Sequence, residues 1–221
     1  MFKEGMLAMV GQGFIESIYM TVISTILAYV IGLPLGLLLV VTDKDGIHPI
    51  PWLNSILGLI VNFVRSIPFL ILLIAVMPFT RMVVGTIIGA KAAIVGLWIA
   101  AAPFIARMVE SSLKEVDAGV IEAAQSMGAS NLQIICKVLL PEAKPSLING
   151  AVISMVTILG YSAMASTIGG TGLGQIAIIY GHQRSKGDIT WLCVFLMVII
   201  VQIIQEVGMR IVHKSDKRIN K

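Results

Sequence analysis

Charged residues are scarce in this chain. Asp, Glu, Lys and Arg make up 13% of its 221 residues, whereas a soluble domain carries about 25%. Hydrophobic residues account for 57%, and the mean hydropathy is +0.94. The apolar residues fall in long blocks rather than in the helical or alternating stripes of a soluble core. This pattern excludes a water-soluble globular protein and predicts an all-α integral membrane protein.

Cysteine and histidine are also sparse. Cys136 and Cys193 are far apart with a predicted span between them, so we interpret both as reduced thiols rather than a disulfide or a metal site. His48, His182 and His213 fall in or beside loops, without metal-ligand spacing or a nucleophile partner. We therefore expect no bound metal or cofactor, and an enzyme embedded in the membrane is a disfavoured alternative.

The sequence lacks Gly-x-x-x-x-Gly-Lys-Ser/Thr, the phosphate-binding loop of ATPases. Gly169, Gly170, Gly172 and Gly174 superficially resemble a nucleotide loop, but they follow a predicted span and no βαβ unit surrounds them. We expect them to form a flexible outer turn that lets the chain return to the membrane. Any ATP hydrolysis that drives this protein must therefore occur in another polypeptide.

Acidic residues are missing from the predicted spans, because every Asp lies in a loop or tail and Glu206 lies at a helix end. Transporters driven by protons or sodium usually carry an ionisable relay within their spans. An ion-coupled secondary transporter is therefore the less favoured alternative.

Five segments are long enough to cross a bilayer, which takes about 20 apolar residues of helix. They are approximately 18–41, 55–79, 83–108, 147–168 and 189–205. We expect Gly32, Pro34 and Gly36 to loosen or kink the first span. Lys91 should snorkel at the outer end of the third span, whose start the sequence leaves open. The first apolar run is too long for a cleavable signal peptide, so we expect it to be retained.

Basic residues predict the orientation, because they accumulate in cytoplasmic loops. With the C-terminus inside, five spans place the N-terminus outside. The ten basic residues then inside are Lys44, Arg107, Lys114, Lys137, Lys144, Arg210, Lys214, Lys217, Arg218 and Lys221. The four outside are Lys3, Arg81, Arg184 and Lys186. This asymmetry favours a cytoplasmic C-terminus, and the tail cluster indicates topology rather than nucleic-acid binding.

A polar stretch at 107–146 separates the third and fourth spans of what we expect to be a single transmembrane domain, 1–221. Asp117 is a predicted N-cap, and Gly128 is suited to the left-handed conformation that ends a helix. Ser130 followed by Gln133 matches a capping box that opens a second helix. We expect Pro141 and Pro145 to terminate that second helix before the chain re-enters the membrane.

The first of these helices has the features of a docking element. Ala123 and Ala124 would allow close approach to a partner's groove, while Val120, Ile121 and Met127 supply apolar anchors. The alternative is an amphipathic connector that rests on the membrane surface.

Several positions of this loop resemble the EAA motif of bacterial ABC importer permeases. The matching residues are Glu122, Ala123, Ala124 and Gly128, followed after nine residues by Val138, Leu140 and Pro141. The resemblance implies a type I ABC importer permease fold and a coupling helix that docks on a partner ATPase. It further implies two copies of the chain, two ATPase subunits that use ATP and Mg, and an extracytoplasmic solute-binding protein.

Other segments point to the substrate. Arg65, Ser66 and Pro68 are similar to a segment of amino-acid importer permeases, although Arg65 could equally snorkel at a membrane surface. Over nearly its whole length the chain looks like the methionine-uptake permease family, through these residues, 102–110, the EAA loop, 160–164 and 172–174. Tyr161, Ser162 and Met164 are candidates to line the pathway, with ordinary helix packing as the alternative. Methionine is the favoured substrate, and other amino acids remain open.

Overall fold

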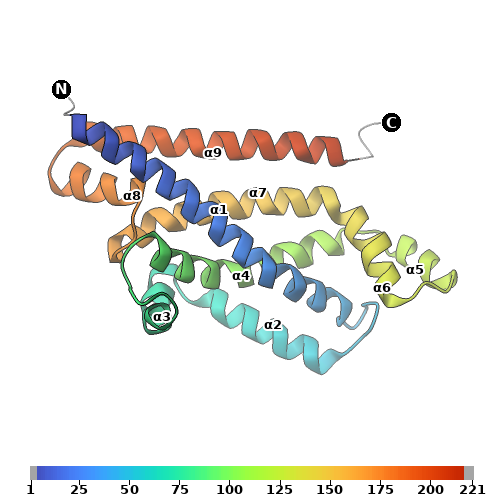
Figure 1. Ribbon diagram of the computed structural model, residues 1–221. Coiled ribbons are helices and arrows are strands. Elements are labelled where there is room, and N and C mark those ends of the chain that lie inside the picture. The colour runs from blue at the N-terminus through green and yellow to red at the C-terminus, as the bar shows by residue number, and fades with distance from the viewer. Residues whose placement is uncertain (1–3, 217–221) are drawn as a thin grey trace. The chain divides into compact units, whose positions relative to one another are not determined.

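The computed structural model describes residues 4–216, and every regular element within that range is a helix (Figure 1). The all-α prediction is therefore confirmed for these residues. Lys3, Lys217, Arg218 and Lys221, which contribute to the predicted orientation, lie outside the described residues.

Four helical stretches are long and apolar enough to cross a membrane: α1 (Glu4–Val41), α4 (Ala90–Lys114), Asn131–Ile168 and α9 (Gly187–Ser215). The helices extend beyond the predicted spans, because α1 begins well before residue 18 and α9 continues past Glu206. The start of α4 at Ala90 places Lys91 in its first turn, where the side chain is exposed. This exposure fits the snorkelling interpretation.

The second predicted span is wrong as a single helix. The chain forms α2 (Pro51–Ser66) and α3 (Phe69–Val84), and the two qualify as a fifth span only when the bent pair is counted together. The break falls at Ile67 and Pro68. Proline lacks an N–H donor and disfavours helical geometry in the residue before it, which explains why the helix stops there.

The predicted helix end at Pro141 and Pro145 is also wrong. Helix α6 (Asn131–Ile134) continues through a π-helical segment (Ile135–Leu139) into α7 (Leu140–Ala165), with Pro145 inside it. Leu140 N–H bonds to the carbonyl of Ile135, five residues back. Such a π turn shifts the hydrogen-bonding register, so a helix can accommodate proline without ending.

The chain divides into two compact units, to which α1, α4, α7 and α9 all contribute. Unit 1 contains the residues up to Ala28, Ile67–Ala101 and Ser154–Gln205. Unit 2 contains Tyr29–Ser66, Ala102–Ile153 and the residues from Glu206 onward. The predicted coupling helix therefore belongs to unit 2.

In unit 1, the glycine-rich turn joins α7 to α8 (Leu173–Gln175) and a π-helical segment (Ile176–Gln183). Gly169 and Gly172 adopt φ values of 108° and 94°, which favour glycine. The Leu173 N–H donates to Ser17 Oγ at 2.9 Å, and a Cβ on Gly174 would lie 2.6 Å from Ala163 Cα. The turn is therefore closely packed. The sequence predicted a flexible outer turn and gave no indication of this packing. The core of unit 1 gathers around two apolar clusters, represented by Ile189 and Leu97.

In unit 2, α1 runs without interruption through Pro34, and its glycines contact α4. A Cβ on Gly32 would lie 2.8 Å from the Ala102 carbonyl oxygen, and one on Gly36 would lie 2.5 Å from that of Ala106. Small residues four positions apart let membrane helices approach closely. Close packing against α4 therefore accounts for these glycines, and the loosening or kink of the first span stays a prediction.

Candidate functional site

The predicted coupling helix is α5 (Ala118–Ser126), and its start is as expected. Asp117 has extended backbone geometry, and its Oδ1 accepts from the Gly119 N–H at 2.8 Å. This bond satisfies one of the free N–H groups at the helix start, so the predicted N-cap is confirmed.

The C-terminal end of α5 is a Schellman motif centred on Gly128. Gly128 has φ +76°. Its N–H donates to the Gln125 carbonyl at 2.9 Å, and the Ala129 N–H donates to the Ala124 carbonyl at 3.1 Å. These two bonds are the pair that defines the motif. The predicted left-handed glycine is confirmed.

A capping box then opens α6, as predicted. Ser130 Oγ accepts from the Gln133 N–H at 3.4 Å, and Gln133 Oε1 accepts from the Ser130 N–H at 2.9 Å. The turn between α5 and α6 is thus stabilised from both sides by local contacts.

The predicted docking residues lie on different faces of α5. Val120, Ala123 and Met127 are exposed and spaced to lie on one face, with Met127 81% exposed. Ala124, in contrast, is only 4% exposed, so it packs within the chain. Pro141 is exposed in the first turn of α7.

A groove of about 480 Å³ lies in unit 2 between α5 and the turn that follows α1. The α5 side contributes Ile121, Glu122 and Gln125. The turn contributes Asp43, Asp45, Gly46 and Ile47, and the lining is completed by Ala118, the first residue of α5, and by Val40, Leu113, Lys114, Val116 and Leu139. Carboxylates and apolar side chains therefore line the same groove.

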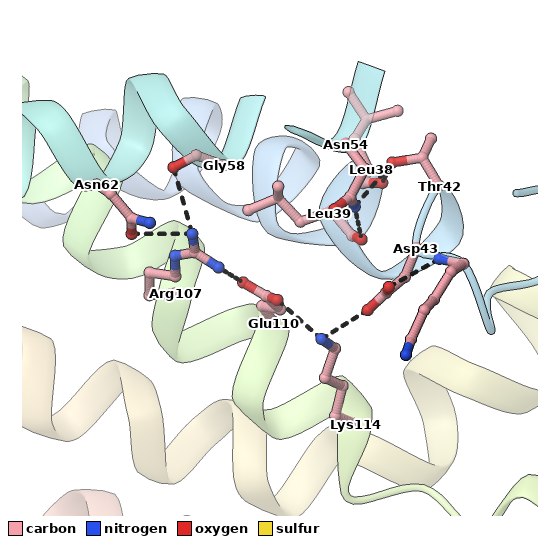
Figure 2. Close-up of polar contacts among 11 residues, drawn as sticks. Leu38, Leu39, Thr42, Asp43, Asn54, Gly58, Asn62, Arg107, Glu110 and Lys114 are labelled. Carbon is pink, nitrogen blue, oxygen red and sulfur yellow. Dashed lines mark hydrogen bonds and ion pairs between the residues drawn. The ribbon is translucent and has the colours of Figure 1, made fainter. Parts of the chain in front are cut away.

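A chain of charges runs through the end of α4, close to this groove (Figure 2). Lys114 Nζ lies 2.8 Å from Asp43 Oδ2 and 3.0 Å from Glu110 Oε1. Arg107 pairs with the other oxygen of Glu110 at 2.5 Å. The Glu110 side chain is 13% exposed, so its negative charge is partly desolvated. Arg107 and Lys114 are the two cations that balance this charge.

Arg107 also connects α4 to α2. Its guanidinium donates to the Asn62 Oδ1 at 2.9 Å and to the Gly58 carbonyl at 3.3 Å. The planar fork of arginine makes such divergent contacts possible.

The end of α1 is capped by side chains. Thr42 Oγ1 donates to the Leu38 carbonyl at 2.6 Å, and Asn54 of α2 donates to the Leu39 carbonyl at 2.6 Å. The bond from Asn54 satisfies a carbonyl of the last turn of α1, whereas the Leu38 carbonyl also accepts from the Thr42 N–H at 3.0 Å. Asp43 follows directly, and its hydrogen bond with Lys114 holds the pKa of the Asp43 carboxyl below its usual range.

The substrate-pathway candidates fall in both units, and each is described within its own. In unit 2, Arg65 and Ser66 are exposed in the last turn of α2, so Arg65 is not in the middle of a continuous span. Ser66 Oγ donates to the Asn62 carbonyl at 2.8 Å. The α2 dipole favours a cation such as Arg65 at this end.

In unit 1, Tyr161 stacks on Phe69 with ring centroids 4.2 Å apart. Ser162 is 2% exposed and donates to the Leu159 carbonyl at 2.7 Å, which is the packing alternative described above. Met164 is 48% exposed, and Pro68 is exposed at the helix break. Of these residues, Pro68 and Met164 have the accessibility that a pathway contact needs.

Sequence reasoning missed the polar connections of α4. Asp43, Asn54 and Asn62 gave no local signal, because their partners are distant in the chain. Glu110 and Lys114 are spaced i, i+4 on one helix and could have been recognised as a pair. Within residues 4–216, no group of three or more His, Cys, Asp or Glu side chains could hold a metal ion, and Cys136 and Cys193 are free thiols.

Comparison with known proteins identifies the family. A Vibrio cholerae protein named probable D-methionine transport system permease protein MetI is 49% identical over 203 residues, covering 92% of this chain and 90% of the relative. The Bacillus subtilis methionine import system permease protein MetP is 48% identical over 181 residues, covering 82% of each.

A solved chain from the methionine ABC transporter MetNI, in an inward-facing conformation, matches with a TM-score of 0.96. It is 47% identical, and the match covers 98% of this chain and 100% of that one. The model of the family described as binding-protein-dependent transport system inner membrane component matches residues 32–221. With this match over most of its length, the chain belongs to that family of bacterial membrane transport proteins.

Proposed function

We propose that this chain is the permease subunit of an ATP-driven ABC importer that carries methionine across the bacterial cell membrane. The observation that carries the proposal is the near-complete match to a chain of a methionine ABC transporter, at 47% identity and a TM-score of 0.96. The relatives named as methionine permeases support the same substrate. An importer of another amino acid is the alternative.

In the proposed complex, residues 1–221 act as one permease domain, and two copies of it form the translocation pathway. Two ATPase subunits, which bind ATP and Mg, contact the coupling loop at 107–146. An extracytoplasmic solute-binding protein delivers the substrate. The exposed face formed by Val120, Ala123 and the C-cap residue Met127 is the proposed contact with the ATPase.

The proposed cycle couples ATP to alternating access. ATP binding closes the ATPase subunits, α5 moves with them as a rigid body, and the pathway opens outward. Hydrolysis and product release return it to the inward-facing state. The caps at both ends of α5 support this role, because a short helix must keep its shape to transmit a displacement.

Uptake of labelled methionine tests the substrate. Cells that lack this gene should lose ATP-dependent uptake and regain it when the gene is returned. Unlabelled methionine should compete better than other amino acids. If another amino acid competes more strongly, the substrate assignment is wrong although the transporter class stands.

We also propose that the N-terminus is outside and the C-terminus is cytoplasmic. In a background with Cys136→Ser and Cys193→Ser, an impermeant thiol reagent should label a cysteine at Gln175, or at the more exposed Gln183, in intact cells. A cysteine at Ser130 should react only after the cells are opened. Labelling of Ser130→Cys from outside would refute both the orientation and the docking role of α5.

A further inference from the structure

Lys114 occupies the junction between a membrane helix and the coupling helix. It is the last residue of α4, and only Glu115 and Val116 separate it from Asp117, the N-cap of α5. The direction in which α5 leaves α4 therefore depends on how the last turn of α4 is held. Lys114 holds this turn through two carboxylates, Asp43 and Glu110.

The contact to Asp43 reaches a segment that is itself well fixed. Asn54 and Thr42 cap the end of α1 immediately before Asp43. The following turn is closed by backbone bonds from Gly46 N–H to the Asp43 carbonyl at 2.9 Å and from His48 N–H to the Val41 carbonyl at 2.9 Å. Asp43 thus presents its carboxylate to Lys114 from a rigid base.

The groove beside α5 shows which element this contact supports. Asp43 and Lys114 line it together with Ile121, Glu122 and Gln125 of α5. The groove leaves space between the turn after α1 and the coupling helix, and the ion pair bridges that turn to the root of α5. Loss of the pair would leave two carboxylates without Lys114 and release this bridge.

We propose that Asp43, Glu110 and Lys114 act as positioning residues for transport: they hold the end of α4 on the turn after α1, and so set the direction of α5 against the ATPase. The inference rests on the proposed importer function. The contact of Lys114 with Asp43 differs from an ordinary surface ion pair such as Arg210 with Glu206, because it joins two separate elements and not residues four apart on one exposed helix.

Four variants test the proposal in the assembled transporter: Lys114→Gln, Asp43→Asn, the double variant and Lys114→Arg. Each is assayed for amount in the membrane, co-purified ATPase, ATP hydrolysis and methionine uptake. Glu206→Gln and Arg210→Gln are controls, because these two side chains pair with each other on α9 and are 65% and 74% exposed.

We expect both single neutralisations to lower uptake per ATP hydrolysed by about two- to fivefold, the range of a partly exposed ion pair. The double variant should be no worse than Lys114→Gln alone, because that change already removes the contact that Asp43→Asn breaks. Lys114→Arg should retain coupling, and the controls should match wild type. A loss of membrane protein in proportion to uptake, with uptake per ATP unchanged, would overturn the proposal in favour of a merely stabilising role.

A measurement that needs no transport separates this inference from the proposed function. Spin labels on cysteines at Asp45 and Gln125, two exposed groove residues, report the distance between the turn and α5 in the Cys136→Ser, Cys193→Ser background. Lys114→Gln should broaden that distance distribution. An unchanged distribution refutes the positioning role, whereas absence of methionine uptake by the wild type refutes only the function.

Discussion

Replacing Gly128 with valine is expected to uncouple the transporter while leaving the membrane helices inserted. Gly128 has φ +76°, and a Cβ built on it meets no atom within 4 Å. The penalty is therefore conformational and not a clash with neighbouring elements. A residue other than glycine costs about 1–2 kcal/mol in this conformation, and more when it is β-branched.

The chain can avoid this strain only by giving up the Schellman motif. That would release the bonds donated by Gly128 and Ala129, each of which contributes about 0.5–1.5 kcal/mol net. The two costs are similar, so the C-terminal turn of α5 should fray in a large share of molecules. A penalty of 1–2 kcal/mol reduces the ordered population about 5- to 30-fold relative to the frayed one.

A substitution series tests this reasoning through methionine uptake and ATPase co-purification at equal membrane expression. Loss should increase from Gly128→Asn through Gly128→Ala to Gly128→Val, because asparagine tolerates the left-handed region best. Gly11→Val is the matched control, since Gly11 lies in α1 with open space around its Cβ position and no positive φ. Wild-type uptake by all three Gly128 variants, or equal damage from asparagine and valine, would refute the argument.

Three further predictions follow from other parts of unit 2. Gly36→Leu should lower the melting temperature of the purified complex through overpacking of about 1–3 kcal/mol, because a Cβ would lie 2.5 Å from the Ala106 carbonyl oxygen; an unchanged melting temperature would contradict this packing. Asp117→Ala should speed proteolysis near α5 by removing a cap that contributes about 0.5–2 kcal/mol, whereas Asp117→Ser should not, and equal rates for both variants would argue against the cap. Asp43 has a lowered pKa in the folded chain, so its pairing with Lys114 stabilises the chain above the unfolded pKa of about 3.9 and is lost as pH falls through the lower folded value. The melting-temperature difference between wild type and Asp43→Asn should accordingly persist from about pH 7 to 5 and shrink progressively as pH falls below about 3.9, and a constant difference would contradict the assignment.

Both ends of α5 and the start of α6 could be predicted from sequence because the contacts that form them are local. Asp117 caps an N–H two residues away, and Ser130 and Gln133 cap each other. Gly128 needed only the freedom of its own backbone. Interactions of this kind depend on neighbouring residues, so they can be recognised without knowing what packs around them.

Proline shows the opposite case. Pro68 interrupts the helix, whereas Pro34, Pro141 and Pro145 are tolerated in continuous helical stretches. The missing N–H and the restricted preceding residue are the same at each site. A π turn or contacts with neighbouring helices can compensate for the missing N–H and the restricted backbone. Which of these is present depends on the residues packed around the proline, and the local sequence does not indicate them.

By itself the sequence determined that the chain is a helical membrane protein, that α5 is a separate capped helix, and which family it resembles, because composition, caps and motif spacing are properties of the chain order. Tertiary structure decided that Ala124 faces inward, that Gly32 and Gly36 serve close packing, and that Lys114 meets Asp43. Each of these depends on residues far apart in the sequence meeting in space. Such contacts form only when burial and hydrogen bonding across helices outweigh the entropy of ordering them, and that balance belongs to the folded molecule.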